Sequence, residues 1–565
     1  MADPLIADET RPLLAGTVYK TPSATTVAVN SHSDTDVEAV KHGSHSDDLT
    51  AFADDPDNPR NWPSAFRWTI AFLLAFMAFT VTFTCISVVP FASHIVDELE
   101  GHPKDGSGGG VGSASVLLVT IWELGEAAGP LAIAPLSETI SWGRAKVLTA
   151  TSVLFALATA MAAIAPSTTL FIAARGLTGL AVATNVLNPA IVGDMFPPDQ
   201  RGSAMSLVQL TPLMGGAIGP AIGGALADTW GWRSVLWLST GLAVACNVLV
   251  WAAFRETYPP AILSARRQRL RKERQALQAA KLAGAASVPF SPSSSSLSSS
   301  SDVPVTSDDP SSSSAPPILT TSPTPSGLRR IRDAVLRPAI LLADSFVLAS
   351  MAIYGAILFS YFYVMSVSLP DILEYRYGFS SAATGSSFLV FSLGAFCSVI
   401  ICNHYLDPIY RHLTNTRGRI SPEDGVTRIG RPEFKLPLTL SCGLLLPMAV
   451  AAYGWSAELI LPLPCVLLSV GAMGASMMLT FIPLAAYVVD AFGLYAASAM
   501  TGVIVTRCLC GTFLPLTVAP LVAAYGYGWG FMVLAGICFV ITPVPFAVYF
   551  YGEQWRQLSK YTRDA

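Results

Sequence analysis

WTIAFLLAFMAFTVTFTCISVVP, at residues 68–90, contains no charged side chain and is long enough as a helix to cross a membrane. A hydrocarbon core about 30 Å thick needs roughly 20 apolar residues of helix. Eleven further apolar stretches follow, and the twelve expected spans are 68–90, 114–138, 147–165, 169–193, 204–227, 233–254, 340–367, 382–403, 437–454, 459–487, 496–522 and 529–551. The sequence therefore predicts an all-α polytopic membrane protein with twelve transmembrane helices.

The composition agrees with this prediction. Of the 565 residues, 52% are hydrophobic and 13% are charged, and the mean hydropathy is +0.51, whereas soluble domains carry about 25% charged residues. The nine cysteines all lie inside apolar stretches, which argues against a disulfide framework or a thiolate metal site. The sequence contains no HExxH, Walker A or GxSxG motif. We expect no enzymatic activity, metal, cofactor or nucleic-acid partner.

The polar segments divide the chain into five parts. We expect a disordered cytoplasmic tail at 1–66, a six-helix bundle at 67–254, a cytoplasmic linker at 255–337, a second six-helix bundle at 338–551 and a cytoplasmic tail at 552–565.

The linker itself has two parts. Its residues 264–284 are rich in Ala, Arg, Gln and Leu and predict a basic helix, either solvated or resting on anionic headgroups. Residues 288–326 are rich in Ser and Pro and predict a disordered tether.

The distribution of positive charge predicts the orientation. If both termini are cytoplasmic, only Lys104, Arg233 and Arg376 lie in outer loops, while Arg175 and Arg507 lie in the membrane. The other 29 of the 34 Lys and Arg residues then lie inside. Because cytoplasmic loops carry an excess of Lys and Arg, we expect both termini in the cytoplasm.

The fifth expected span contains the glycine-rich sequence QLTPLMGGAIGPAIGGALAD at 209–228. Small residues let membrane helices approach closely, and an internal proline favours a kink. One helix face carries Gly215, Gly219 and Gly223, with Gly216, Pro220 and Gly224 beside them. The pattern predicts a packing seam, and it resembles the antiporter signature of the twelve-helix drug/proton antiporter branch of the major facilitator superfamily.

Other stretches carry the same resemblance. The sequence from Arg175 to Leu180 is similar to the motif whose arginine is implicated in proton coupling. Glu138, Gly143 and Arg144 are similar to the motif that forms a cytoplasmic latch between the halves, although Gly143 here follows Glu138 by five positions, which differs from the family spacing. Further similar stretches are 55–62, Asp194 with Arg201 and Gly202, 230–233, 256–258, 487–492, and Ser498 and Ala499 with Arg507. The resemblance covers about residues 54–556 and is closest to fungal members.

The resemblance implies a major facilitator fold, in which two six-helix bundles enclose a substrate cavity near the membrane midplane. It implies a monomeric proton-coupled antiporter in the lipid bilayer. The substrate would be a small molecule: a secondary metabolite, such as an organic acid like itaconate or a glycolipid, or a xenobiotic drug. Two alternatives remain open, a proton symporter that imports a nutrient and a membrane sensor that does not transport.

The second expected span contains two acidic residues, Glu123 and Glu126, on one helix face. Counted from Ala114, Glu126 is roughly 18 Å deep. Burial and a like-charged neighbour both favour the protonated form of a carboxyl group. Three interpretations remain open: proton coupling by at least one glutamate, a structural ion pair between Glu123 and Arg175, and direct contact with substrate.

The second half contributes Arg507, in the eleventh expected span, with no acidic residue at matching depth in the same half. Backbone carbonyls, tyrosine hydroxyls, water or an anionic substrate would satisfy it. The seventh span adds Tyr354, Tyr361 and Tyr363, which are either substrate-cavity residues or ordinary wall material.

The expected location is the plasma membrane. The alternative is the vacuolar membrane, because residues 9–14 (ETRPLL) resemble an acidic dileucine sorting signal.

Overall fold

The computed structural model describes residues 55–100, 112–137, 143–182, 184–286, 327–420 and 428–559. The dileucine-like segment, Glu138 and the Ser/Pro-rich stretch 288–326 lie outside the described residues.

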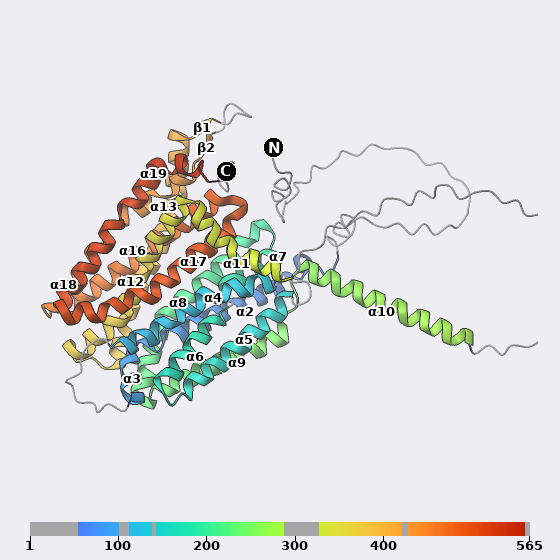
Figure 1. Ribbon diagram of the computed structural model, residues 1–565, viewed down its shortest axis with the longest axis horizontal. Helices are drawn as coiled ribbons and strands as arrows, with labels where there is room; N and C mark the ends of the chain where they lie inside the picture. Colours follow the sequence, from blue (N-terminus) through green and yellow to red (C-terminus); the bar gives the residue numbers. More distant parts are fainter. Residues whose placement is uncertain are drawn as a thin grey trace, which may run out of the picture.

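The described chain is helical apart from one short hairpin (Figure 1). The first half contains α2 (Ser64–Ile86), α3 (Ala92–Glu100), α4 (Ser113–Ser137), α5 (Gly143–Ala163), α6 (Thr168–Leu180), α7 (Thr184–Met195), α8 (Pro198–Trp230) and α9 (Trp232–Ala253). In the sequence, the two halves are connected through α10 (Pro259–Ala286) and α11 (Gly327–Asp344). The second half contains α12 (Phe346–Tyr377), α13 (Ser381–Arg417), β1 (Arg419–Ile420), β2 (Arg428–Ile429), α14 (Pro437–Cys442), α15 (Leu445–Glu458), α16 (Leu463–Phe492), α17 (Ala496–Phe513), α18 (Val518–Ile541) and α19 (Pro543–Arg556).

The predicted spans agree with these helices. By length and composition, ten stretches of the described chain are able to span a membrane, and one of them, Ala496–Arg556, contains the eleventh and twelfth predicted spans together. The fourth predicted span is divided between α6 and α7, each too short to qualify alone. The fold is the expected twelve-helix fold.

Local sequence sets several helix ends. Ser345 and Ser380 cap the N-termini of α12 and α13, where their side-chain oxygens accept backbone N–H groups of the first turn. Gly378 ends α12 in the left-handed conformation, with φ 68°. Gly231, with φ 79°, turns the chain between α8 and α9. These signals place the turns between consecutive spans.

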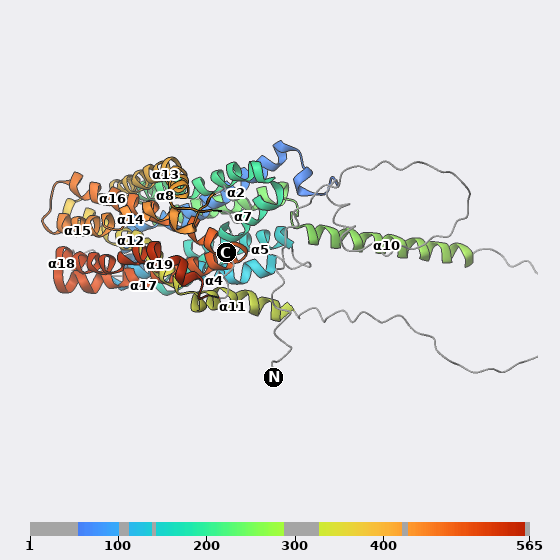
Figure 2. The ribbon, with the colours of Figure 1, turned by 90° about the horizontal axis from the view of Figure 1, so that it is seen from above.

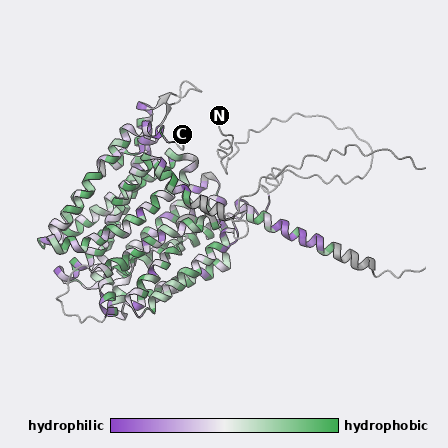
Figure 3. Cartoon of the chain, in the orientation of Figure 1, coloured by the Kyte–Doolittle hydropathy of each residue, from purple (hydrophilic) through white to green (hydrophobic). Residues whose placement is uncertain are grey.

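The two halves lie side by side and contact each other most extensively where α8 packs on α13 and α4 packs on α17 (Figures 1 and 2). The chain enters α2 and leaves α19 at one end of the bundle, here called the near end, and the opposite end is called the far end. The helices of the bundle consist mainly of hydrophobic residues (Figure 3), and many large apolar side chains are exposed, among them Trp251 at 83%. Such a surface is suited to lipid.

Candidate functional site

An ion pair joins the two halves in the middle of the bundle. Arg507 of α17 donates from Nη2 to Oε1 of Glu126 of α4 over 2.9 Å, and the two side chains are 14% and 9% exposed. The indole N–H of Trp122 donates to the other oxygen of Glu126 over 3.0 Å. The guanidinium carbon of Arg507 lies 4.3 Å from the ring centre of Phe359. The partner of Arg507 thus comes from the other half, which explains why no acidic residue at matching depth was found in its own half.

Glu123 lies one helical turn before Glu126 and has a different environment. Its Oε1 accepts the hydroxyl of Tyr363 from α12 over 2.5 Å, and the residue is 1% exposed. Within the described part of the chain, no Lys or Arg nitrogen lies within ion-pair distance of Glu123. A hydrogen bond from a neutral phenol therefore takes the place of a cationic partner.

Arg175 does not form the structural ion pair with Glu123 that was one interpretation of the sequence. Its two terminal nitrogens donate to the backbone carbonyls of Thr84 (2.9 Å) and Cys85 (2.7 Å), where α2 ends. Its guanidinium carbon lies 5.6 Å from the ring centre of Trp122. Arg175 thus fixes α6 to α2 within the first half.

Of the three candidate tyrosines, the structure brings only Tyr363 to this cluster. The Tyr361 hydroxyl donates to the carbonyl of Leu534 in α18 over 2.5 Å, within the second half. Tyr354 is buried, and its hydroxyl lies near Gly443. Tyr363 belongs to an aromatic group in which neighbouring ring centres are 5.0 to 6.4 Å apart: Phe359, Phe362, Tyr363, Phe391 and Phe481.

The glycine-rich face of α8 packs closely on α2, as the sequence predicted. A Cβ atom on Gly223 would lie 2.1 Å from the carbonyl oxygen of Ser87, and one on Gly215 would lie 2.9 Å from that of Phe79. At Gly219 the nearest atom would be 3.5 Å away, which is ordinary contact.

The adjacent face of α8 contacts the other half. A Cβ atom on Gly224 would lie 2.1 Å from the carbonyl oxygen of Ser381, and one on Gly385 of α13 would lie 2.0 Å from that of Pro220. The motif therefore serves two interfaces, one within the first half and one between the halves.

Polar contacts also join the halves at the far end. Asp228, at the end of α8, accepts the backbone N–H of Ala382 in the first turn of α13 over 2.9 Å. His94 of α3 contacts Glu374 of α12 over 2.6 Å. Sequence reasoning missed these residues, because their types are ordinary at the ends of membrane helices.

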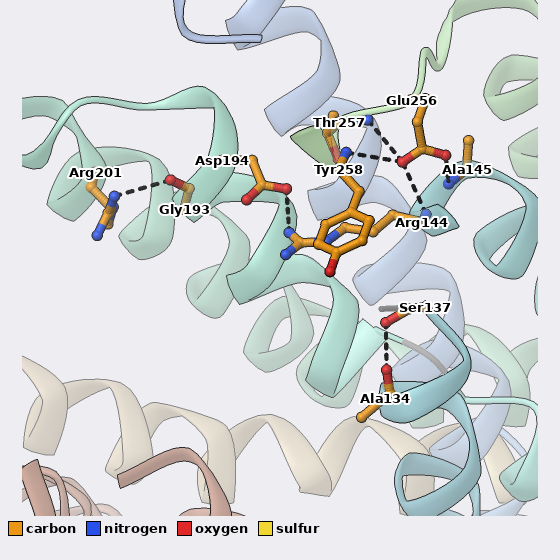
Figure 4. A network of polar contacts seen from close by, with 10 residues as sticks. All are labelled: Ala134, Ser137, Arg144, Ala145, Gly193, Asp194, Arg201, Glu256, Thr257 and Tyr258. Atoms are coloured by element: carbon orange, nitrogen blue, oxygen red, sulfur yellow. Dashed lines mark hydrogen bonds and ion pairs between the residues drawn. The ribbon is translucent and has the colours of Figure 1, made fainter. Parts of the chain in front are cut away.

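At the near end, Arg144 forms an ion pair with Asp194 of α7 over 2.5 Å (Figure 4). Burial raises the pKa of Asp194 to about 6, although the positive charge of Arg144 acts in the opposite direction. Beside this pair, Arg201 donates to the carbonyl of Gly193 over 3.0 Å. The first turn of α5 is thus held by a partly buried carboxylate.

Glu256, directly after α9, completes this network. Its carboxylate accepts the backbone N–H groups of Arg144 (2.9 Å) and Ala145 (3.1 Å). These groups lie at the N-terminus of α5, where the partial positive charge of the helix dipole stabilises a carboxylate. Gly143 has φ 69°, and a Cβ atom there would lie 2.3 Å from Glu256 Oε2. The described contacts of Gly143 and Arg144 are with the first half and with the segment that follows α9, and the third candidate latch residue, Glu138, lies outside the described residues.

Comparison with known proteins gives matches over most of the chain. A sequence profile described as Major Facilitator Superfamily matches residues 68–515. The efflux pump radE of Floropilus chiversii is 28% identical over 512 residues, which cover 90% of this chain and 84% of that protein. The MFS transporter cpaT of Aspergillus oryzae is 29% identical over 508 residues, which cover 90% of this chain and 91% of that protein.

Among solved structures, the crystal structure of a D-xylose-proton symporter matches with a TM-score of 0.58. Its sequence is 13% identical, and the match covers 86% of this chain and 98% of that one. At this identity the likeness shows the fold alone.

Proposed function

The chain belongs to the Major Facilitator Superfamily, and we propose that it is a proton-coupled antiporter that exports a small organic molecule. Relatives over most of its length are named as transporters and efflux pumps, so the protein is a membrane transporter and not an enzyme. The proposed substrate is a secondary metabolite or a xenobiotic, the classes that the resemblance to drug/proton antiporters implies.

The observation that carries the proposal is that acidic groups outnumber basic groups in the central cluster, which consists of Glu123, Glu126 and Arg507. Two carboxyl groups, Glu123 and Glu126, share one nearby guanidinium, Arg507, while Arg175 is held by backbone carbonyls. A charge buried without a partner is costly. One bound proton would make the three-residue cluster neutral, and a cluster that gains and loses one proton is suited to proton coupling.

The environments of the two glutamates favour Glu123 as the proton carrier. Glu126 is stabilised as a carboxylate by Arg507 and by the Trp122 N–H. Glu123 is almost fully buried, and its Oε1 accepts the neutral Tyr363 hydroxyl. Desolvation disfavours the ionised form most where no cation compensates it. This assignment differs from an expectation based on depth alone, which favours Glu126.

The contacts between the halves support an alternating-access cycle. At the far end, Asp228 with Ala382 and His94 with Glu374 hold the halves together. We take the near end as cytoplasmic, because most Lys and Arg side chains lie there, so the structure would represent a state closed to the outside. Proton uptake from outside and release inside would then alternate with substrate export.

Antiport requires that a bound proton lowers the affinity for substrate. Because coupling between two ligands is reciprocal, bound substrate then lowers the affinity for the proton by the same factor. The central cluster offers groups for this purpose. Arg507 Nε has no hydrogen-bond partner among the described residues, and the ring of Phe359 lies beside the guanidinium. A substrate that contacts this cluster would change the pairing of Arg507 and therefore the proton affinity of the glutamates.

We further propose that the protein acts as a monomer in the plasma membrane, with the vacuolar membrane as the alternative. At either membrane the potential contributes about 2.3 kcal/mol per charge per 100 mV. One inward proton per cycle would support tens-fold accumulation of substrate.

The experiment begins with metabolite profiles of cells with and without the protein, together with a panel of drugs. The compound identified is then tested with purified protein in proteoliposomes carrying an imposed pH gradient. Antiport predicts accumulation on the acidic side. Accumulation on the alkaline side would indicate proton symport instead, and absence of flux for every compound would favour a sensor.

A further inference from the structure

The helix α10 leaves the near end of the first half and extends away from the bundle (Figure 1). Its 28 residues correspond to a length of about 42 Å at 1.5 Å per residue. The first turn packs on the bundle through Ala261, whereas every residue from Ala265 to Leu277 is exposed. The exposed part is strongly hydrophilic (Figure 3). Its sequence is not explained by packing within the protein.

The exposed part of α10 carries a concentrated positive charge. Between positions 266 and 274 the only acidic residue is Glu273. The basic residues in the same stretch are Arg266, Arg267, Arg269, Arg271, Lys272 and Arg274. A surface of this composition is complementary to an extended negative charge.

One side of α10 also carries an apolar stripe. Leu263, Leu270 and Leu277 recur every seven residues and therefore lie close to one line along the helix. Leu270 is 46% exposed and Leu277 is 62% exposed. Arg267 and Arg274 are four residues after a leucine of the stripe, so their apolar stems lie on the same side. The combination of leucines and long basic side chains suits the boundary between lipid headgroups and acyl chains.

The connection to α9 keeps the first turns of α10 close to the bilayer. Exposed Trp251 lies in the last turn of α9, and α10 begins at Pro259 only a few residues later. Glu256 holds the connection by accepting the N–H groups at the start of α5. An ion pair between Arg266 and Asp55 fixes the base of the helix to the residues before α2. The beginning of α10 is thus held beside the membrane surface.

We propose that α10 binds the anionic lipid headgroups of the leaflet at the near end. Each Lys or Arg close to an anionic membrane strengthens binding by about fivefold, an effect that falls off within a Debye length. Several such residues on a tethered helix are enough to favour the bound form. The inference concerns the lipid surface and does not depend on what the protein transports.

The test uses the full chain reconstituted in two kinds of bilayer nanodisc, phosphatidylcholine alone and phosphatidylcholine mixed with phosphatidylserine. Amide hydrogen exchange is measured over residues 259–286. We expect at least a tenfold slower exchange over 266–277 in the anionic bilayer, and loss of this difference at high salt. Equal exchange in the two bilayers would overturn the proposal.

Two variants separate the lipid from other partners. The substitutions Arg269→Gln, Arg271→Gln, Lys272→Gln and Arg274→Gln should abolish the difference between the bilayers. The control removes two exposed basic residues of α13, Arg411→Gln and Arg417→Gln, and should leave exchange in α10 unchanged. If protection persists in the first variant, a protein contact and not the lipid covers the helix, and the proposal fails.

Discussion

The carboxylate of Glu126 and the guanidinium of Arg507 lie 2.9 Å apart and connect α4 of the first half to α17 of the second. Both side chains are largely withdrawn from solvent, so each depends on the other. Removal of one partner from such a pair leaves an uncompensated buried charge and costs about 3–5 kcal/mol, whereas neutralisation of both costs much less.

We therefore expect Glu126→Gln and Arg507→Gln to lower the thermal stability of the protein in detergent, each by several degrees. The double variant should recover much of the loss, because neither charge remains without its partner. Thermal unfolding of all four proteins gives the coupling. Additive losses would show that the two side chains do not depend on each other.

Glu123→Gln should behave differently. The amide oxygen still accepts the Tyr363 hydroxyl, and no cation loses its partner, so stability should stay within about 1 kcal/mol of the parent. Because the amide neither takes up nor releases a proton near neutral pH, export driven by a pH gradient should fail while exchange of substrate across the membrane continues. Both rates are measured in proteoliposomes.

Tyr361→Phe provides the control for Glu123→Gln. It removes a buried hydroxyl whose hydrogen bond goes to Leu534, outside the cluster, so coupling should remain. If Glu123→Gln vesicles still accumulate substrate in response to the gradient, the coupling residue lies elsewhere, and Glu126 is the next candidate.

The glycines of α8 should differ in their tolerance to a methyl group. Gly223→Ala brings Cβ against the Ser87 carbonyl and should destabilise the first half by about 1–3 kcal/mol. Gly224→Ala brings Cβ against the Ser381 carbonyl of the other half and should therefore favour separation of the halves at the far end. Gly216→Ala is the control, with its nearest neighbour at 3.5 Å. Equal stability and transport in all three variants would contradict the proposed packing.

Asp194 should give the protein a pH-dependent stability. In the folded protein this carboxyl binds a proton below pH about 6, compared with the usual 3.8. The folded state therefore binds more protons than the unfolded state between about pH 4 and 6, and the stability from this group falls as pH rises through that window. Asp194→Asn should flatten this slope in thermal unfolding, whereas Asp407→Asn, at an exposed position, should not. If the pH dependence of thermal stability is unchanged in Asp194→Asn, this carboxyl is not its source.

Asp228→Ala should weaken closure at the far end. Loss of a carboxylate that accepts a helix N-terminal N–H, here that of Ala382, costs about 1 kcal/mol. Spin labels at positions 230 and 386 would report the distance between α8 and α13, and we expect a larger population of long distances. Thr229→Ala is the control, because the Thr229 hydroxyl donates to carbonyl groups of α8 itself. A distance distribution identical to the parent would rule out a closing role for Asp228.

Hydropathy alone was sufficient for the twelve-helix fold, since each span must satisfy its own backbone within the bilayer. The spacing of glycines on one helix face was likewise sufficient to predict the glycine seam, because small residues let membrane helices approach closely. These features depend on one helix at a time.

The partners of the buried charges depend on two helices at once, and they were not predicted. Depth along each span was used to compare Arg507 only with acidic residues of its own half. Its partner is Glu126, which α4 supplies from the other half. Arg175 binds the carbonyls of Thr84 and Cys85, and a backbone acceptor leaves no trace in the identity of the residue that provides it. Knowledge of which helices pack together would have been needed in both cases.

The seam between α8 and α13 consists of main-chain atoms meeting glycine, at Gly224 with Ser381 and at Gly385 with Pro220. No side chain interlocks at these two points, so the helices separate or slide there without any side chain having to cross a rotameric barrier. Such a joint moves as a rigid body. Its opening rate should then be governed by the polar contacts around it, and natural variation at positions 224 and 385 should be limited to glycine.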